Sequence, residues 1–167
     1  GIAELTQLLD DPEIRYMSEM MNFPGVLNRD PTVIAKLALA QERGLPIDGH
    51  APGLLGEDAR RYAAAGISTD HECFSLAEAE SKIAAGMMIL IREGSAARNF
   101  DVLHPLISSH TNQVMLCSDD KHPDELVAGH IDRLAARAVA LGHNLFDVLQ
   151  CICLNPIKHY NLPLGSL

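Results

Sequence analysis

The feature that most constrains this chain is a regular alternation of short apolar runs with segments of helical periodicity. Five times along the sequence, an apolar run of strand length ends in turn residues and is followed by a helical pattern. This alternation is typical of a parallel α/β fold, because consecutive parallel strands must be joined by a crossover that is usually a helix. We therefore predict parallel strands over residues 14–21, 45–49, 67–70, 87–91 and 113–117.

Capping residues and glycines mark the helices between these strands. Asp30 followed by Pro31 is a typical helix start, and Gly44 lies where that helix should end. Ser75 and Glu78 have the spacing of a capping box at the start of a second helix. No repeat or flexible linker divides the chain, so a single domain is expected. Other helices are expected over residues 57–65, 130–141 and 144–153.

Composition and charge argue against several classes of function. The net charge of −9 comes without a cluster of Lys or Arg, which argues against nucleic acid as a partner, because phosphate binding requires a concentrated basic surface. No apolar run approaches the roughly 18 residues that span a bilayer, and the first residues do not resemble a signal peptide. We expect a cytoplasmic protein with no membrane partner. The four cysteines are expected to be reduced and without a chemical role.

Polar and ionisable side chains collect where the predicted strands end. In a parallel sheet or (β/α)₈ barrel, the carboxyl ends of all strands face the same side, so residues that are distant in sequence converge there. Neutral imidazole and carboxylate oxygen are ligands that suit zinc, manganese or iron. The sequence therefore indicates a site for one or two divalent metal ions. The residues that form this pattern are Glu19, His50, His71 with Glu72, Arg92 with Glu93, and Asp119 with Asp120.

Structural roles compete with this interpretation. A lone histidine at a strand end is more often a hydrogen-bonded structural residue than a ligand, and only the repetition over successive strands favours a site. Asp119 or Asp120 could instead cap the helix that follows, and Asp120 is the better placed of the two. The histidines away from the strand ends are interpreted as surface or capping residues: His104, His110, His130, His143 and His159.

Five stretches in these regions resemble the adenine deaminases of the amidohydrolase superfamily. They are S-E-M-M-N-F-P-G-V at 18–26, G-H-A-P-G-L at 49–54, A-G-I-S-T-D-H-E at 65–72, R-E-G-S-A-A-R-N at 92–99 and C-S-D-D-K-H-P at 117–123. Their order and their spread over most of the chain make the resemblance specific. It implies an α/β fold that is part of a (β/α)₈ TIM-type barrel of metal-dependent hydrolases, with about five parallel βα units that correspond to strands four to eight.

The resemblance also implies a set of metal ligands. Glu19, on strand four, would take the metal-bridging place that a carboxylated lysine occupies in many relatives. His50 on strand five and His71 on strand six would be further ligands. Asp119, at the end of strand eight, would be both a ligand and the proton carrier. The implied cofactor is one or two divalent ions of manganese, iron or zinc.

The implied reaction is hydrolytic deamination of adenine to hypoxanthine and ammonia, in which a metal-bound hydroxide attacks C6 of the purine. Asp119 would take the proton from the water and deliver it to the ring nitrogen or the leaving amine. His71 and Glu72 complete the catalytic group that we expect. The substrate side would be lined by Arg92, Glu93, Ser95, Asp120, His122 and Phe23.

Alternatives stay open for some of these residues. Glu72 or Glu93 could pair with a neighbouring arginine instead of contacting the purine. His122 could merely orient Asp120, and Phe23 could be a packed aromatic in a rigid loop.

One departure from the family pattern concerns the start of the barrel. The family begins with an H-x-H pair on strand one, and no H-x-H occurs in this sequence. We therefore expect residues 1–167 to be a single-domain fragment of the catalytic barrel, without its first strands and too incomplete to be a full catalyst alone. One alternative is another metal-dependent amidohydrolase acting on a cyclic amide. The other is a non-catalytic half-barrel that forms a homo-oligomer to cover its exposed strand edges.

Overall fold

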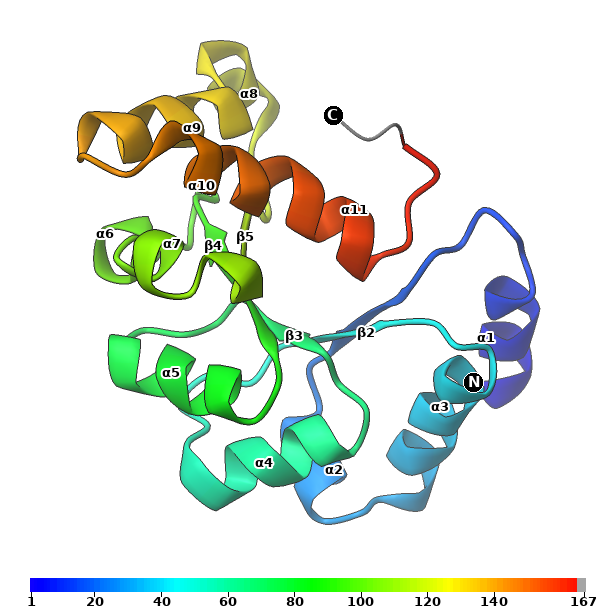
Figure 1. Cartoon of the computed structure of the whole chain (residues 1–167). Helices are drawn as coiled ribbons and strands as arrows, with labels where there is room; N and C mark the ends of the chain where they lie inside the picture. The colour runs from blue at the N-terminus through cyan, green and yellow to red at the C-terminus, as the bar shows by residue number, and fades with distance from the viewer. Residues whose placement is uncertain (165–167) are drawn as a thin grey trace.

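The computed structural model describes residues 1–164, and its strands form a curved row with helices arranged around them (Figure 1). The paired strands are parallel: β1 with β2, β3 with β4, and β4 with β5. The predicted α/β class and parallel strands are therefore confirmed. The strands are β1 (Met17–Met20), β2 (Ile47–Gly49), β3 (Thr69–Asp70), β4 (Met88–Arg92) and β5 (Val114–Cys117).

Helices follow every strand. Those before β5 are α1 (Ile2–Leu9), α2 (Phe23–Leu27), α3 (Pro31–Glu42), α4 (Gly56–Ala64), α5 (Leu76–Ala84), α6 (Phe100–Leu103), α7 (Leu106–Ser109) and the 3₁₀ turn Thr111–Gln113. Those after β5 are α8 (Pro123–Ala128), α9 (Ile131–Ala140), α10 (Leu145–Leu149), a π-helix (Gln150–Leu154) and α11 (Asn155–His159). No helix within residues 1–164 is both long and apolar enough to cross a membrane.

The predicted helix starts are largely correct. The Asp30 side chain accepts hydrogen bonds from the first turn of α3, and Gly44 follows that helix in a left-handed conformation with φ of 64°. Ser75 caps α5 by accepting a bond from the Glu78 N–H. The capping box is not closed, however, because the Glu78 carboxylate is engaged by other groups. The helix predicted over 144–153 also differs, since α10 ends at Leu149 and gives way to the π-helix.

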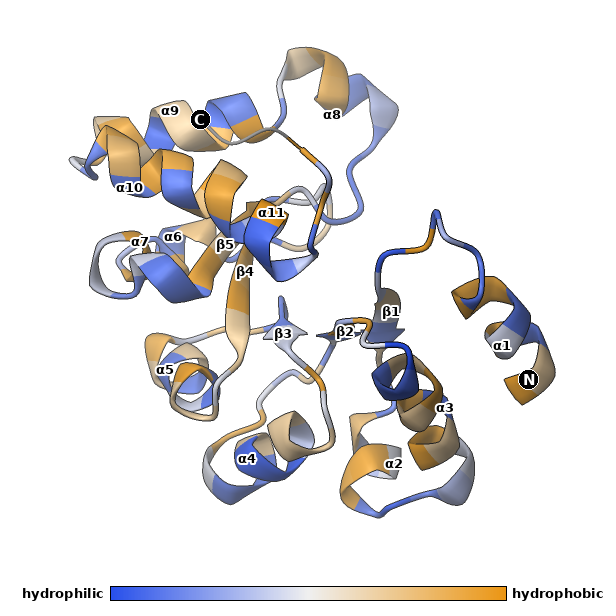
Figure 2. Cartoon of the chain, turned by 45° about the vertical axis from the view of Figure 1, so that its right-hand side comes forward, coloured by the Kyte–Doolittle hydropathy of each residue, from blue (hydrophilic) through white to orange (hydrophobic). Residues whose placement is uncertain are grey.

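Two hydrophobic clusters pack the strands against their helices. Figure 2 shows how apolar β4 and β5 are, and the first cluster is built on them. Ile89 and Ile91 are fully buried there and alternate with Met88 and Leu90, which are only partly buried, so one face of β4 packs against the helices. The second cluster joins β1 and β2 to α2, α3 and α4. This packing leaves the carboxyl ends of the strands for polar residues.

The regular hydrogen-bond ladder breaks between β2 and β3, so the strands form a two-stranded and a three-stranded sheet rather than one. The Ser68 N–H still donates to the Ile47 carbonyl at 2.9 Å. The next donors are taken by side chains: the Gly49 N–H donates to Thr69 Oγ1 at 3.3 Å, and the His50 N–H donates to the Tyr62 hydroxyl at 3.1 Å. Side-chain acceptors therefore replace the ladder where the two strands meet.

Gly49 permits this close approach. A Cβ at this position would lie 2.3 Å from the Thr69 carbonyl oxygen and 3.0 Å from Cε1 of Tyr62. Tyr62 is fully buried, and its hydroxyl donates to the Met20 carbonyl at 2.7 Å while it accepts from His50. One buried tyrosine thus joins the ends of β1 and β2, beside a position where the structure has room only for glycine.

We predict that Gly49→Ala lowers the free energy of unfolding by about 3 kcal/mol, because the added methyl group meets backbone that cannot move aside easily. Urea denaturation followed by circular dichroism measures the loss. Gly142→Ala is the matched control, since that glycine has φ of 96° and open space around it. It should cost only the left-handed strain of about 1–2 kcal/mol. Equal losses in both variants would contradict the close-approach argument.

Candidate metal centre

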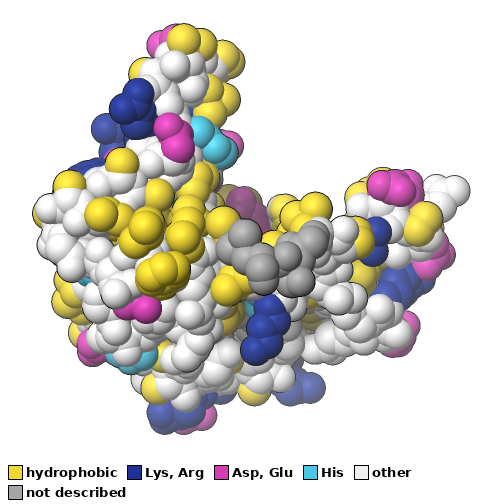
Figure 3. Space-filling model, turned by 45° about the horizontal axis from the view of Figure 1, so that its top comes forward, with side chains coloured by type: hydrophobic (Ala, Val, Ile, Leu, Met, Phe, Trp, Pro, Cys, Tyr) yellow, Lys and Arg dark blue, Asp and Glu magenta, His cyan; other side chains and the backbone are white. Residues whose placement is uncertain are grey.

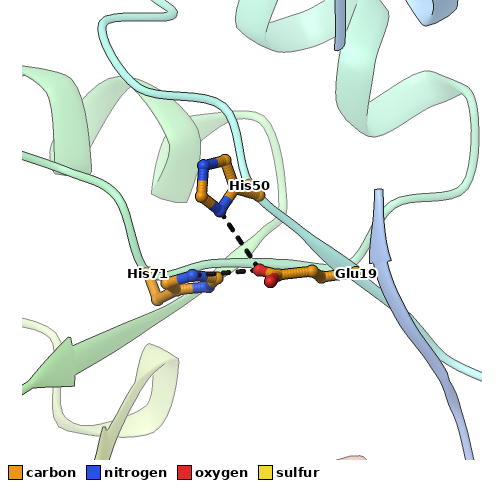
Figure 4. Close-up of side chains that lie close together, drawn as sticks. All are labelled: Glu19, His50 and His71. Carbon is orange, nitrogen blue, oxygen red and sulfur yellow. Dashed lines mark hydrogen bonds and ion pairs between the residues drawn. The ribbon is translucent and has the colours of Figure 1, made fainter. Parts of the chain in front are cut away.

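Glu19, His50 and His71 converge at the carboxyl ends of β1, β2 and β3 (Figure 4). Nδ1 of His50 lies 3.2 Å and Nε2 of His71 lies 3.0 Å from the same Glu19 oxygen, Oε2. One ligand atom from each residue lies within 4.8 Å of the others. Ligands about 2.0–2.2 Å from a tetrahedral metal lie roughly 3.4 Å apart, so these atoms are close to the spacing that one cation requires.

The local sequence explains why these side chains meet. Met17 and Met20 of β1 are buried in the core, whereas Glu19 between them is half-buried and faces the histidines. His50 and His71 are each the first residue after a strand, where the chain leaves the sheet. The sequence prediction that these residues share one end of a parallel sheet therefore agrees with their positions in the structure.

A second group of charges lies against this cluster. Oε1 of Glu72 is 3.5 Å from His50 Nδ1 and 3.5 Å from His71 Nε2. Nη1 of Arg92, at the end of β4, lies 2.5 Å from that Glu72 oxygen and 2.5 Å from Oδ2 of Asp119. Glu72 and Arg92 are both only 6% exposed. Arg92 thus links Asp119 to the histidines through Glu72.

Asp119 has an unusual backbone conformation for an aspartate at a strand end. Its φ is 51°, in the left-handed region that residues other than glycine seldom adopt, although aspartate does so more readily than most. Such conformations persist where the surrounding structure fixes them, and they are concentrated at functional sites. Here the Arg92 guanidinium holds the carboxylate. Asp119 contacts Arg92 rather than the Glu19 cluster directly, and its role as a ligand stays a prediction.

The remaining predicted substrate residues line the loops beyond β4 and β5. The Glu93 carboxylate faces Arg137 of α9 at 3.2 Å, and Ser95 Oγ donates to Glu125 of α8 at 2.8 Å. The His122 N–H donates to Ser95 Oγ at 2.8 Å. These contacts join the two loops to one another and to the helices that follow β5.

Two residues differ from their expected local structure. Phe23 is the first residue of α2 rather than part of a loop, and it packs partly buried against the β1–β2 core. Asp120 does not cap α8, because that helix begins at Pro123 with His122 at its N-cap position and has no side-chain cap. Asp120 instead accepts a bond from the Ser95 N–H through its main-chain carbonyl, at 2.9 Å.

The histidines away from the strand ends also make contacts that the sequence did not indicate. His104 and His143 are hydrogen-bonded to one another at 2.9 Å, and Ser108 Oγ bonds His143 at 2.7 Å. Burial lowers the pKa of His143, and the neighbouring His104 acts in the same direction. His159 bonds Ser68 at 3.2 Å. These hydrogen bonds bridge separate segments, which the surface-or-capping interpretation did not include. His104 nevertheless occupies the C-cap position of α6, and all three histidines are partly exposed.

Further buried polar groups lie within the strands that lead to the site. Asp48, two residues before His50, accepts hydrogen bonds from Thr69 Oγ1 at 2.8 Å and from the Tyr160 hydroxyl at 2.9 Å. Burial raises the pKa of Asp48 above its ordinary value, although these hydrogen bonds act in the opposite direction. Burial also raises the pKa of the Cys117 thiol to about 12, so this cysteine is protonated at neutral pH.

Comparison with known proteins adds independent findings. The model of the amidohydrolase family matches residues 2–167. The curated adenine deaminase of Salinibacter ruber is 53% identical over 100% of this chain, and that of Sulfurovum is 52% identical over 100% of it; the match covers 31% of each relative. The adenine deaminase of Borreliella afzelii is 46% identical over 98% of this chain and 31% of its own length. The chain therefore spans about a third of the length of these relatives.

A solved structure supports the fold. A TatD homologue from Escherichia coli K12 is similar to this chain with a TM-score of 0.65, over 97% of this chain and 70% of that one, at 18% sequence identity. At this identity the likeness concerns the fold alone. The resemblance inferred from the five sequence stretches is confirmed by the curated relatives.

We predict that Glu19→Gln weakens binding of manganese or zinc by about 100-fold or more, beyond the 10- to 100-fold typical of residues that only support a ligand. Isothermal titration calorimetry on the folded chain measures the affinity. Glu80→Gln, which changes an exposed glutamate of α5, is the control and should bind as the wild type does. Equal affinity of the Glu19 variant and the control would contradict the assignment.

Proposed function

This chain belongs to the amidohydrolase family, and from that premise we propose that it forms part of an enzyme that hydrolyses adenine to hypoxanthine and ammonia. The observation that carries the proposal is the convergence of Glu19, His50 and His71. Relatives 46–53% identical over nearly the whole chain are curated as adenine deaminases, which favours adenine over a cyclic amide as the substrate.

We propose that the row of strands corresponds to strands four to eight of a (β/α)₈ barrel. Consecutive strands are neighbours in the order of the sequence, and helices connect them. That order is expected of a barrel, whereas an open doubly wound sheet reverses its strand order at a switch point. The similarity to the TatD homologue supports the same architecture.

The donor set fits a divalent ion of manganese, iron or zinc, because it combines one carboxylate with two imidazoles. Glu19, His50 and His71 would hold the first of one or two such ions. When bound, such an ion supplies a Lewis acid that makes water a nucleophile near neutral pH. The chemistry of the ligands does not select among the three metals.

The proton would be carried by Asp119. In this role it accepts the proton of the attacking water and returns it to a purine nitrogen or to the leaving amine. Arg92 fixes the carboxylate for this task by its contact at 2.5 Å. Because the same guanidinium also holds Glu72, a single buried side chain aligns the proton carrier with the group beside both histidines.

In this proposal, Glu72 and Arg92 would contact the purine. Oε1 of Glu72 lies 3.5 Å from each of the two histidine nitrogens, and it would share a proton with a ring nitrogen of a substrate bound beside them. Nε of Arg92 is buried and has no hydrogen-bond partner among the described residues. A buried donor without a partner is costly.

The loops beyond β4 and β5 would form the outer wall of the substrate site. Ser95 and His122 are hydrogen-bonded to one another there, and Asp120 lies in the same loop as His122. Glu93 would act through its contact with Arg137, by holding the loop against α9. Phe23, at the start of α2, supplies an aromatic surface near the end of β1.

We predict that, in the enzyme of which this chain forms part, Asp119→Asn reduces the manganese-dependent release of ammonia from adenine by about 10²- to 10⁴-fold, the usual contribution of a general acid and base. Coupled detection of ammonia measures the rate. Asp124→Asn, an exposed residue of α8, should behave as the wild type does. Persistence of the wild-type rate in the Asp119 variant would contradict its role.

Two other results would redirect the proposal. Opening of a cyclic amide such as dihydroorotate, without release of ammonia from adenine, would favour the other amidohydrolase activity. A folded, metal-loaded chain that releases no ammonia would show that its residues are not sufficient for the reaction.

We also propose that two copies associate through their strand edges. Within residues 1–164, the edge of β1 away from β2 and the edge of β5 away from β4 have no partner strand. Unpaired edges are prone to pair with another chain. Figure 3 shows hydrophobic side chains gathered on one face of the molecule. Among the exposed hydrophobic residues, Leu145 and Phe146 of α10 are 51% and 77% exposed. Such surfaces often mark an interaction site.

We predict a mass in solution of twice 18.1 kDa, measured by light scattering after size-exclusion chromatography. Phe146→Ser should shift the population towards the single chain, because it removes an exposed aromatic from the hydrophobic surface. Glu80→Gln, which changes an exposed charged residue of α5, is the control. A wild-type chain that stays monomeric at high concentration would contradict the association.

A further inference from the structure

A buried group of charges lies behind the loops that carry His50 and His71. It consists of Lys82 and Glu78 on α5 and Asp70 at the end of β3. Nζ of Lys82 is 2.8 Å from Glu78 Oε1 and 3.3 Å from Asp70 Oδ1, and these side chains are 0%, 4% and 0% exposed, respectively. The three are distinct from the metal ligands proposed above.

Asp70 holds the backbone on both sides of the centre. Its Oδ2 accepts from the Ala51 N–H at 2.8 Å, and its Oδ1 accepts from the Glu72 N–H at 2.7 Å. Ala51 directly follows His50, and Glu72 directly follows His71. A single carboxylate therefore fixes the peptide next to each histidine and sets the spacing between the two loops.

Glu78 and Lys82 continue this arrangement further along the same loops. The Glu78 carboxylate accepts from the Gly53 N–H at 2.7 Å and from the Phe74 N–H at 3.0 Å. Nζ of Lys82 donates to the Ala51 carbonyl at 2.7 Å. These hydrogen bonds are thus made to backbone in the two segments that follow the histidines, and the Cys73 side chain adds a weak contact to Asp70 at 4.0 Å.

Stability alone does not account for such a group. Burying charges costs free energy, and well-packed apolar residues in place of a buried ion pair are often as stable. Burial would lower the pKa of Lys82, but the carboxylates of Asp70 and Glu78 are among the groups that outweigh it and raise that pKa above its ordinary value. The lysine therefore stays charged, and the group's directed hydrogen bonds specify one loop geometry.

We propose that Asp70, Glu78 and Lys82 are positioning residues that hold the His50 and His71 imidazoles at the spacing a divalent cation requires. This inference rests on the proposed metal function of the centre. Residues that orient metal ligands from outside typically change metal affinity by about 10- to 100-fold when they are replaced. The effect should therefore appear in affinity and ligand geometry, apart from any effect on folding.

The test uses the chain with cobalt(II) alone, because the visible absorption of bound cobalt depends on ligand number and geometry. Asp70→Asn keeps the size of the side chain but removes one of its two acceptor oxygens. We expect this variant to bind cobalt about 10- to 100-fold more weakly, with an altered absorption spectrum. Hydrogen exchange of the metal-free variant should show local loss of protection at Ala51 and Glu72.

Ile107→Ala, in the β4–β5 core, is the stability control, because it lowers the unfolding midpoint and makes none of the hydrogen bonds that fix the two loops. It should retain the cobalt affinity and spectrum of the wild type. A folded Asp70→Asn chain with wild-type affinity, spectrum and exchange would overturn the inference. Lys82→Met provides the same comparison if the Asp70 variant does not fold. Failure of the wild type and the control to bind cobalt would instead refute the proposed metal centre itself.

Discussion

The centre depends on how the backbone donors beyond β2 and β3 are satisfied. A buried N–H group needs an acceptor, and within a sheet the neighbouring strand normally supplies it. Here the N–H of His50 is bound by the Tyr62 hydroxyl, and the N–H of Ala51 is bound by the Asp70 carboxylate. From the first residue after β2, side chains of α4 and β3 thus accept the hydrogen bonds that a neighbouring strand would otherwise accept. The chain can therefore leave the sheet with the imidazole of His50 directed towards Glu19.

Charge balance gives this end of the sheet its chemical character. Glu19, Glu72 and Asp119 bring three carboxylates near two imidazoles, and Arg92 is the cation that pairs with two of them. Among the ion pairs of the described residues, Glu19 contacts only the histidine nitrogens. Two imidazoles beside a carboxylate that no lysine or arginine contacts among these ion pairs are a donor set that suits a divalent cation.

The sequence was sufficient for the parts of the site that follow from strand direction. The positions of Glu19, His50 and His71 follow from the rule that parallel strands end on one side, and the helix start at Asp30 follows from its capping chemistry. The roles of Tyr62, Asp70 and Lys82 could not be predicted, because they depend on which loop packs over α4 and α5. In sequence, Lys82 four residues after Glu78 suggests an exposed helical ion pair, but both side chains are buried. A charged pair at this spacing can be recognised as buried only when it is known which face of the helix packs against the core.

Each strand of the row is followed along the chain by its neighbour in space, and this order has a kinetic consequence. Contacts between consecutive strands cost less loop-closure entropy than contacts between the two ends of the chain would. A row in which β2 adds to β1 and β5 adds to β4 can grow one unit at a time, without first bringing distant ends of the chain together. The two hydrophobic clusters give this growth two starting points, one at each end of the row. The two parts of the row meet at Gly49 and Thr69. Glu19 and His50 lie on one side of this junction and His71 lies on the other, so assembly of the metal ligands would be among the last events of folding.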